Sequence, residues 1–296
     1  MKAMNPVLRN ECKMAVRNRR FTTTLFVYIA IVAFGVILYY REFANDVFLN
    51  GLSRESSSVL YIIMAIVQAV FLMFLVPSLT SSSISSEREK QTLDILLSTK
   101  LTSFQIIMGK LFSSSLRVIM LIICTLPLYG VASLLGGLDI GNVIELTIFF
   151  IINTIFVGSL GVLISTYCKT SKVSTTLSYF AVLFIYIGII ILTLIIFYFE
   201  ARYNTGTIST IDPSPIVYLS PVTGFISLLG NQVNVTDVSY MIGGIGLSTY
   251  AEYISMAIQL LLSGLFIYLA AIKLNPLNEK KFKVKKNKKK GIKWIL

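Results

Sequence analysis

Residues 81 to 98, SSSISSEREKQTLDILLS, place charged and leucine side chains between two long apolar stretches. The charged residues 87 to 90 indicate that an apolar helix leaves the membrane here, because unpaired charge is costly in hydrocarbon. The leucines that follow have helical spacing, which predicts a short amphipathic helix along the membrane surface. Its polar edge could dock in a groove of a partner, although a passive interfacial helix explains the pattern equally well. The residues selected as candidates are Glu87, Arg88, Glu89, Thr92, Leu93, Asp94, Leu96 and Leu97.

Several kinds of chemistry are excluded by residue types that the chain lacks. It contains no histidine, so HExxH zinc sites and Ser-His-Asp triads cannot form. The sequence Gly109-Lys110 continues with Leu111 and therefore does not complete a P-loop, which requires GxxxxGK[ST]. The cysteines are isolated and give no metal or disulfide spacing. We therefore expect no enzymatic activity, no cofactor and no metal site.

The elements that position the charged stretch are apolar helices. The chain has 296 residues, 55% of them hydrophobic, and a mean hydropathy of +0.78. A helix needs roughly 20 apolar residues to cross the hydrocarbon core. The sequence therefore predicts an all-α membrane protein with six transmembrane helices, the second continuous to residue 86 and the third beginning early, near residue 104. The uncharged stretches are 21–40, 56–86, 118–138, 146–168, 173–199 and 253–272.

The distribution of basic residues predicts the orientation in the membrane, because Lys and Arg near helix ends are retained in the cytoplasm. With both termini inside, all of the 26 Lys and Arg residues except Arg41, Arg54 and Arg202 are cytoplasmic. We expect a multi-pass protein of a bacterial plasma membrane with both termini in the cytoplasm. The net charge of +12 then belongs to the inner membrane face and gives no reason to expect a nucleic-acid partner.

Three regions divide the chain. Residues 1–20 form a basic amphipathic pattern that predicts an interfacial helix, although a charged topology anchor is the alternative. Residues 21–272 form the membrane domain, with a polar region at 87–103 and a long external segment at 200–252. The apolar island at 216–230 is short for a span and predicts a re-entrant or interfacial helix. The polybasic tail at 273–296 serves as a positive-inside anchor or contacts anionic lipid.

The order of these parts resembles the cytoplasmic coupling region of the type-2 ABC transporter permeases. In that family a proline-bearing second helix is followed by E-R-E, a T-L-[DE]-x-L-L helix and a G-K pair at the base of the third helix. The N-terminal stretch NPVLRNECKMAVRNRR and the six-span layout are also similar to that family, so the resemblance covers nearly the whole chain. The motif residues here are Pro77, Glu87, Arg88, Glu89, Thr92, Leu93, Asp94, Leu96, Leu97, Gly109 and Lys110.

The resemblance implies a function as the permease subunit of an ATP-driven ABC exporter. Two such subunits, identical or paralogous, would pair with two separate ATPase chains, and the second and third helices would carry the ATPase movement into the membrane. Leu93 and Leu96 would seat the coupling helix, while Glu87, Glu89 and Asp94 would supply charged contacts. The alternative is a membrane anchor or sensor subunit that holds an ATPase without passing cargo, as in resistance or signalling complexes.

Polar residues in or beside the apolar spans are the candidates for a transport pathway. Gln68 in the second helix and Asn153 in the fourth should face a neighbour or a cavity instead of lipid, with interhelical hydrogen bonding as the simpler role. Glu145 lies at the outer end of the fourth helix, where it could face an exit or the interface. An ion channel is disfavoured, because the sequence has no ring of charge or filter segment. The cargo stays open, with hydrophobic or amphipathic molecules favoured and membrane lipid as a further partner.

Overall fold

The structure is a computed structural model, and it describes residues 23, 26–35, 37, 41, 54–98, 102–136, 139–203, 215–233 and 250–274. These residues are helical or lie in short turns, and they include no strand. The predicted interfacial helix at 1–20, the tail beyond residue 274 and about half of the segment 200–252 lie outside the described residues.

Five helices are long and apolar enough to cross a membrane, within the described part of the chain. They match the second to sixth predicted spans, while the first is represented by the ten-residue apolar helix Phe26–Gly35. The helices are α3 (Arg54–Thr80), α4 (Ser85–Glu89), α5 (Leu93–Leu97), α6 (Ser103–Gly136), α7 (Ile140–Tyr167), α8 (Ser171–Leu183), the π-helix η1 (Phe184–Gly188), α9 (Ile189–Tyr203), the 3-10 helix η3 (Pro215–Leu219), α10 (Pro221–Val233) and α12 (Ala251–Leu274).

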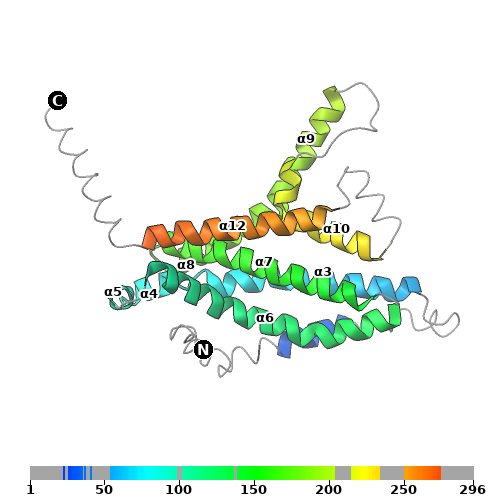
Figure 1. Ribbon diagram of the computed structural model, residues 1–296, viewed down its shortest axis with the longest axis horizontal. Coiled ribbons are helices and arrows are strands. Elements are labelled where there is room, and N and C mark those ends of the chain that lie inside the picture. The colour runs from blue at the N-terminus through cyan, green and yellow to red at the C-terminus, as the bar shows by residue number, and fades with distance from the viewer. Residues whose placement is uncertain are drawn as a thin grey trace.

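Helix α7 lies at the centre of the bundle. It packs against α12, α6, α3 and α8, and α6 packs along α3 (Figure 1). Its Phe149, Phe150 and Phe156 are almost fully buried in the main hydrophobic cluster. This central position explains why α7 is the most buried of the candidate spans.

The expected start of the third span is confirmed, and the second span runs as one candidate span to Glu89, but a turn interrupts its helix. Helix α6 begins at Ser103, well before its fully apolar part, as predicted. Helix α3 instead ends at Thr80, and a turn at 81–84 separates it from α4. The sequence did not reveal this break because the serine-rich stretch is uncharged, as a helix inside the membrane would be.

The second half of the membrane domain is less regular. Residues 184–188 form the π-helix η1, and beyond it α9 leaves the bundle at a steep angle (Figure 1). The short helices η3 and α10 follow, with η3 against α9 and α12 and α10 alongside α12. The Ser220 hydroxyl, between η3 and α10, donates to the Tyr186 carbonyl oxygen at 3.3 Å. This contact ties the segment after α9 to the middle of the preceding span.

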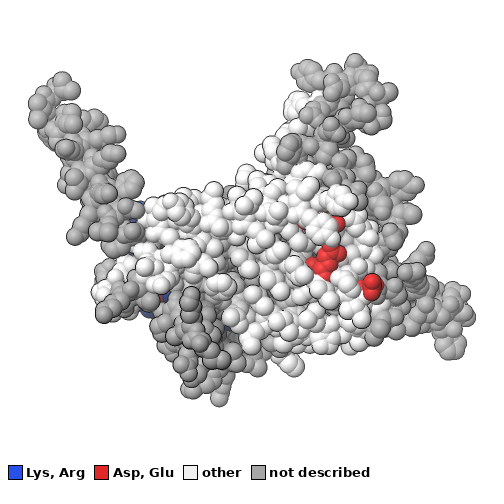
Figure 2. Space-filling model, in the orientation of Figure 1, with Lys and Arg blue, Asp and Glu red and all other residues white. Residues whose placement is uncertain are grey.

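Charged side chains of the described residues gather at opposite ends of the bundle. In Figure 2 a group of acidic side chains lies at the end where α7 and α12 begin, and basic side chains are visible at the other end, beside α4 and α5. On the face that Figure 2 shows, the described surface between the two groups is uncharged. This separation of charge is expected of helices that cross a membrane, because their middle parts lie in hydrocarbon and their ends in water.

Candidate functional site

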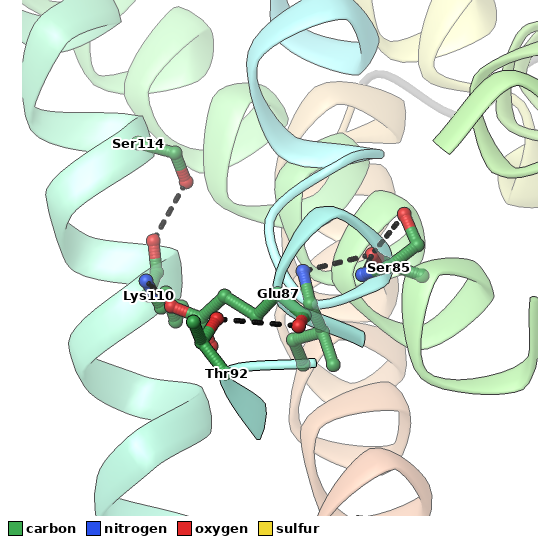
Figure 3. Close-up of polar contacts among 7 residues, drawn as sticks. Ser85, Glu87, Thr92, Lys110 and Ser114 are labelled. Atoms are coloured by element: carbon green, nitrogen blue, oxygen red, sulfur yellow. Dashed lines mark hydrogen bonds and ion pairs between the residues drawn. The ribbon is translucent and has the colours of Figure 1, made fainter. Parts of the chain in front are cut away.

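The candidate residues lie in residues 81–98, a segment here called the hook, which comprises the turn 81–84, α4 and α5. An ion pair fastens the hook to α6, because the Nζ of Lys110 lies 2.6 Å from a carboxylate oxygen of Glu87 (Figure 3). The two side chains are only 14% and 19% exposed. The loop is closed by Thr92, whose backbone N–H donates to the Glu87 carbonyl oxygen at 2.9 Å. Glu87 thus fixes both the shape of the hook and its contact with α6.

The turn at 81–84 is held by α7. The Ser165 hydroxyl oxygen accepts hydrogen bonds from the backbone N–H groups of Ile84 at 3.0 Å and Ser85 at 2.9 Å. These groups are buried, where an unpaired N–H would cost about 1–3 kcal/mol. A side chain of α7 therefore supplies the acceptor that a continuing helix would have provided.

Two glycines in the half of α7 nearest the hook let this helix approach α3 and α6 closely. A Cβ at Gly161 would overlap the Thr80 side chain, with 3.1 Å to the Thr80 Cβ. A Cβ at Gly158 would lie 3.1 Å from a methyl of Leu111. Small residues allow helix backbones to approach in membranes. The glycines therefore bring the Ser165 hydroxyl within reach of the turn.

Two charged residues of α4 bind the corner between α7 and α8. The Arg88 guanidinium donates to the carbonyl oxygens of Cys168 at 2.7 Å and Thr166 at 3.0 Å, at the C-terminal end of α7. A Glu89 carboxylate oxygen accepts from the Ser171 hydroxyl at 2.7 Å and its backbone N–H at 3.2 Å, at the first residue of α8. A cation at a helix C-terminus and an anion at an N-terminus both complement the helix dipole.

A second set of contacts joins the hook to α8 closer to the bundle. The Ser174 hydroxyl donates to the Ser81 carbonyl oxygen, and the Ser81 hydroxyl donates to the Thr175 hydroxyl at 3.0 Å. The serines of the SSSISS stretch therefore act as links between helices. Together with Glu89 they join the hook to the first turns of α8, at Ser171, Ser174 and Thr175.

Helix α5 turns its leucines inward. Leu93 is 7% exposed and packs with Ile84 and Ile107 in a second hydrophobic cluster, against which Leu96 and Leu97 also pack. Ile95, by contrast, is 68% exposed. Asp94 lies in α5, but its side chain is outside the described atoms. The candidate residues are thus brought together in one hook. Most of them are used in contacts within this chain and are not left exposed for a partner.

The three candidate pathway residues do not share one surface. Gln68 is buried and accepts a hydrogen bond from the Thr125 hydroxyl of α6 at 3.4 Å. Asn153 accepts from the Tyr186 hydroxyl and lines a pocket that also includes Phe225 of α10. Glu145 also contacts α10, through the Gln232 amide. Asn153 and Glu145 therefore lie on the side of α7 that α10 covers, whereas Gln68 faces α6.

A polar network at the other end of the bundle was not predicted. The Glu145 carboxylate accepts from the Tyr253 hydroxyl at 2.6 Å and from the Gln232 amide at 3.1 Å. The Gln232 amide oxygen accepts from the Tyr61 hydroxyl at 2.9 Å. Nearby, the buried Glu252 carboxylate accepts from Ser227 and Asn231. Within the described segments, no three side chains of the types that bind metals gather as a metal site would require.

Some of the missed contacts left a signal in the sequence. Gly158, Gly161 and Ser165 fall on one face of α7 at spacings of three and four residues, which is typical of close helix packing in membranes. The contacts of Arg88 and Glu89 left no such signal, because they join residues about 80 positions apart. The network around Glu145 at the opposite end likewise joins four helices, α3, α7, α10 and α12.

The long apolar helices, with charge confined to the ends, define a multi-pass membrane protein. A family model for ABC-2 family transporter proteins matches residues 5–272, almost the entire chain. The chain belongs to this family and is a membrane permease of an ABC system; such permeases normally work with ABC ATPase partners. A search of the curated proteins found no match.

Proposed function

We propose that this chain is the permease subunit of an ATP-driven exporter and that the hook receives the force of a separate ATPase subunit. Two permease subunits, identical or paralogous, and two ATPase chains form the complete transporter. The observation that carries the proposal is the bracing of the hook: Glu87, Arg88 and Glu89 join it to α6, to the end of α7 and to the start of α8. A loop tied to three spans can transmit a push, whereas a free loop would absorb it.

The sequence predicts that the second and third spans carry the ATPase movement into the membrane. The contacts of the hook add two further spans to this route. The second and third spans, α3 and α6, are connected to the hook by the chain and by the ion pair. Arg88 and Glu89 add α7 and α8, and α8 continues into η1 in the middle of the membrane. The ATPase must contact the hook differently in its two nucleotide states, since only differential contact shifts an equilibrium.

Ile95 is the residue that we assign to the ATPase contact. Leu93 is buried against the chain's own core, and Leu96 is partly buried there, so neither is free to enter a partner's groove in this conformation. Ile95 exposes most of its side chain on the outer side of α5. Exposed Thr92 and Glu89 lie on the same hook and supply a polar rim.

In the proposed topology the hook lies in the cytoplasm with both termini and the polybasic tail. The segregation of acidic and basic side chains in Figure 2 supports this orientation. Residues 1–20 form the interfacial helix, and 21–40 form the first of six spans. The segment 200–252 re-enters the membrane from outside, which is supported by the bond from Ser220 to the middle of the fifth span and by the packing of the 13-residue α10 on α12.

The test is Ile95→Asp in membrane vesicles that contain the permease and its ATPase. ATP turnover should continue while ATP-dependent cargo flux falls several-fold, because an aspartate on α5 weakens the contact with the ATPase. The matched control is Ile140→Asp, since Ile140 is 65% exposed at the opposite end of the bundle. Normal flux with Ile95→Asp would contradict the coupling role. An attached ATPase without ATP-dependent flux in the wild type would instead support the anchor or sensor function.

A further inference from the structure

An apolar trough runs along α3 on the side away from α6. It consists of two adjacent pockets that share Ile66 and Val70. The first, about 280 Å³, lies between α3, α7, η1 and α10. The second, about 520 Å³, lies between α3, the helix Phe26–Gly35 and α8. We call this the α3 trough.

The trough has the length and direction of a lipid tail. Its α3 residues run from Ile66 to Ser78, a rise of about 18 Å along the helix at 1.5 Å per residue. One leaflet contributes about half of the roughly 30 Å hydrocarbon core. Because α3 is a candidate membrane span, the trough follows the direction in which acyl chains lie.

The walls offer an occupant apolar surface. Two polar groups in the walls are engaged by the protein: the Tyr186 hydroxyl donates to Asn153, and the Tyr179 hydroxyl donates to the Phe74 carbonyl oxygen at 3.1 Å. The other lining residues are almost all aliphatic or aromatic. A polar cargo would lose hydration here without gaining comparable partners, whereas a hydrocarbon chain loses nothing.

The trough opens sideways. Ile66, Val70, Phe74 and Ile187 on its walls are each about half exposed, and all belong to spans. On a single chain in a bilayer, half-exposed residues of such spans would face acyl chains and not water. The π-helix η1 forms part of one wall, and π turns inside helices occur frequently at functional sites.

We propose that the α3 trough binds one acyl chain of a membrane phospholipid. The chain lies along α3, with its end in the pocket formed by η1 and α10 and its headgroup beyond Ser78 and Tyr179, at the end of the bundle where the hook lies. Bound there, it fills the space between α3, α8 and α10. Binding of the lipid requires neither an ATPase nor transport.

The test uses the full chain in lipid nanodiscs of phosphatidylcholine, a fraction of which carries a photoactivatable diazirine in the acyl chain. Crosslinked residues are located by peptide mass spectrometry. A diazirine near the chain end should label α10 and the Ile66 region, while one near the headgroup should label the Ser78 and Tyr179 region. Labelling of the trough should exceed that of the lipid-facing side of α6 several-fold.

Val70→Trp supplies the matched variant, because Val70 is half exposed and lies where the two pockets join. The indole should occupy the trough and reduce its labelling several-fold. Ile123→Trp, on a half-exposed position of α6 outside the trough, should leave it unchanged. If Val70→Trp fails to fold, the ratio of trough labelling to α6 labelling in the wild type still tests the proposal. Equal labelling of the two faces, a reversed depth order, or a crosslink between two copies through the trough would overturn the proposal.

Discussion

The two ends of the bundle hold their charged groups in different ways. At the hook, Glu87 pairs with Lys110, while Arg88 and Glu89 bond to groups at the ends of α7 and α8. At the other end, Glu145 and Glu252 accept hydrogen bonds from neutral hydroxyl and amide donors. Removing one partner of a buried ion pair costs about 3–5 kcal/mol, more than the loss of a typical hydrogen bond.

The difference suits the two ends to different tasks in the proposed exporter. Helices at the hook must stay together when the ATPase pushes on them, and the ion pair between Glu87 and Lys110 resists separation of α4 from α6. Hydrogen bonds from neutral donors at the opposite end can be exchanged for bonds to water at a smaller net cost. The comparison therefore predicts that single substitutions at the hook end destabilise the protein more than single substitutions at the opposite end.

The largest effect is expected from Lys110→Met. It leaves the mostly buried Glu87 carboxylate without its partner and should lower the free energy of unfolding by about 3 kcal/mol. Denaturant unfolding of the purified protein in detergent measures the change. Adding Glu87→Gln to Lys110→Met should restore most of the lost free energy of unfolding, because the double variant buries no unpaired charge. If Lys110→Met alone is as stable as the wild type, the ion pair does not make the hook end more sensitive than the opposite end.

Gly161→Ala should have the next largest effect. The added methyl overlaps the Thr80 side chain where α7 meets α3, and such overpacking costs about 2 kcal/mol. Gly130→Ala is the matched control, because Gly130 lies inside α6 where an added methyl would meet no neighbouring helix within 4 Å. Thermal unfolding of both variants in the same detergent compares the two sites. If both behave alike, the close approach of α7 and α3 is not a determinant of stability.

The smallest effect of the three is expected for Tyr61→Phe. It removes the hydroxyl that donates to Gln232 in the network around Glu145 and should cost about 1 kcal/mol. Tyr268→Phe, at a 64% exposed position of α12, controls for the loss of a hydroxyl as such. Unfolding in denaturant again gives the change. A loss larger than that of Lys110→Met would reverse the proposed order of the two ends.

Features set by local composition could be predicted from the sequence. The spans at residues 59 and beyond follow from uncharged length, and the short helix at 93–97 follows from the spacing of Leu93, Leu96 and Leu97. The early start of α6 follows from the helical pattern before its apolar part. Each depends on residues that lie close together in the chain, so a single sequence contains the information.

Features set by the meeting of distant segments could not be predicted. Pro77 indicates a kink near the end of α3, but the sequence does not show that the helix ends at Thr80, because the acceptor that stabilises the turn is Ser165 on α7. The inward orientation of Leu93 depends on Ile84 and Ile107, which the sequence does not place beside it. The roles of Arg88 and Glu89 likewise depend on where α7 ends and α8 begins.

The Ser165 hydroxyl oxygen accepts two backbone hydrogen bonds at once, and this limits the residue types that evolution can place at position 165. Alanine would strip two amides of their acceptor at once, and a larger side chain would enter a space already occupied by the turn. Asparagine or aspartate would bring oxygen but also extra bulk or charge. We expect homologues with the same break after the second span to retain a small hydroxyl residue here, while those with an unbroken helix vary freely.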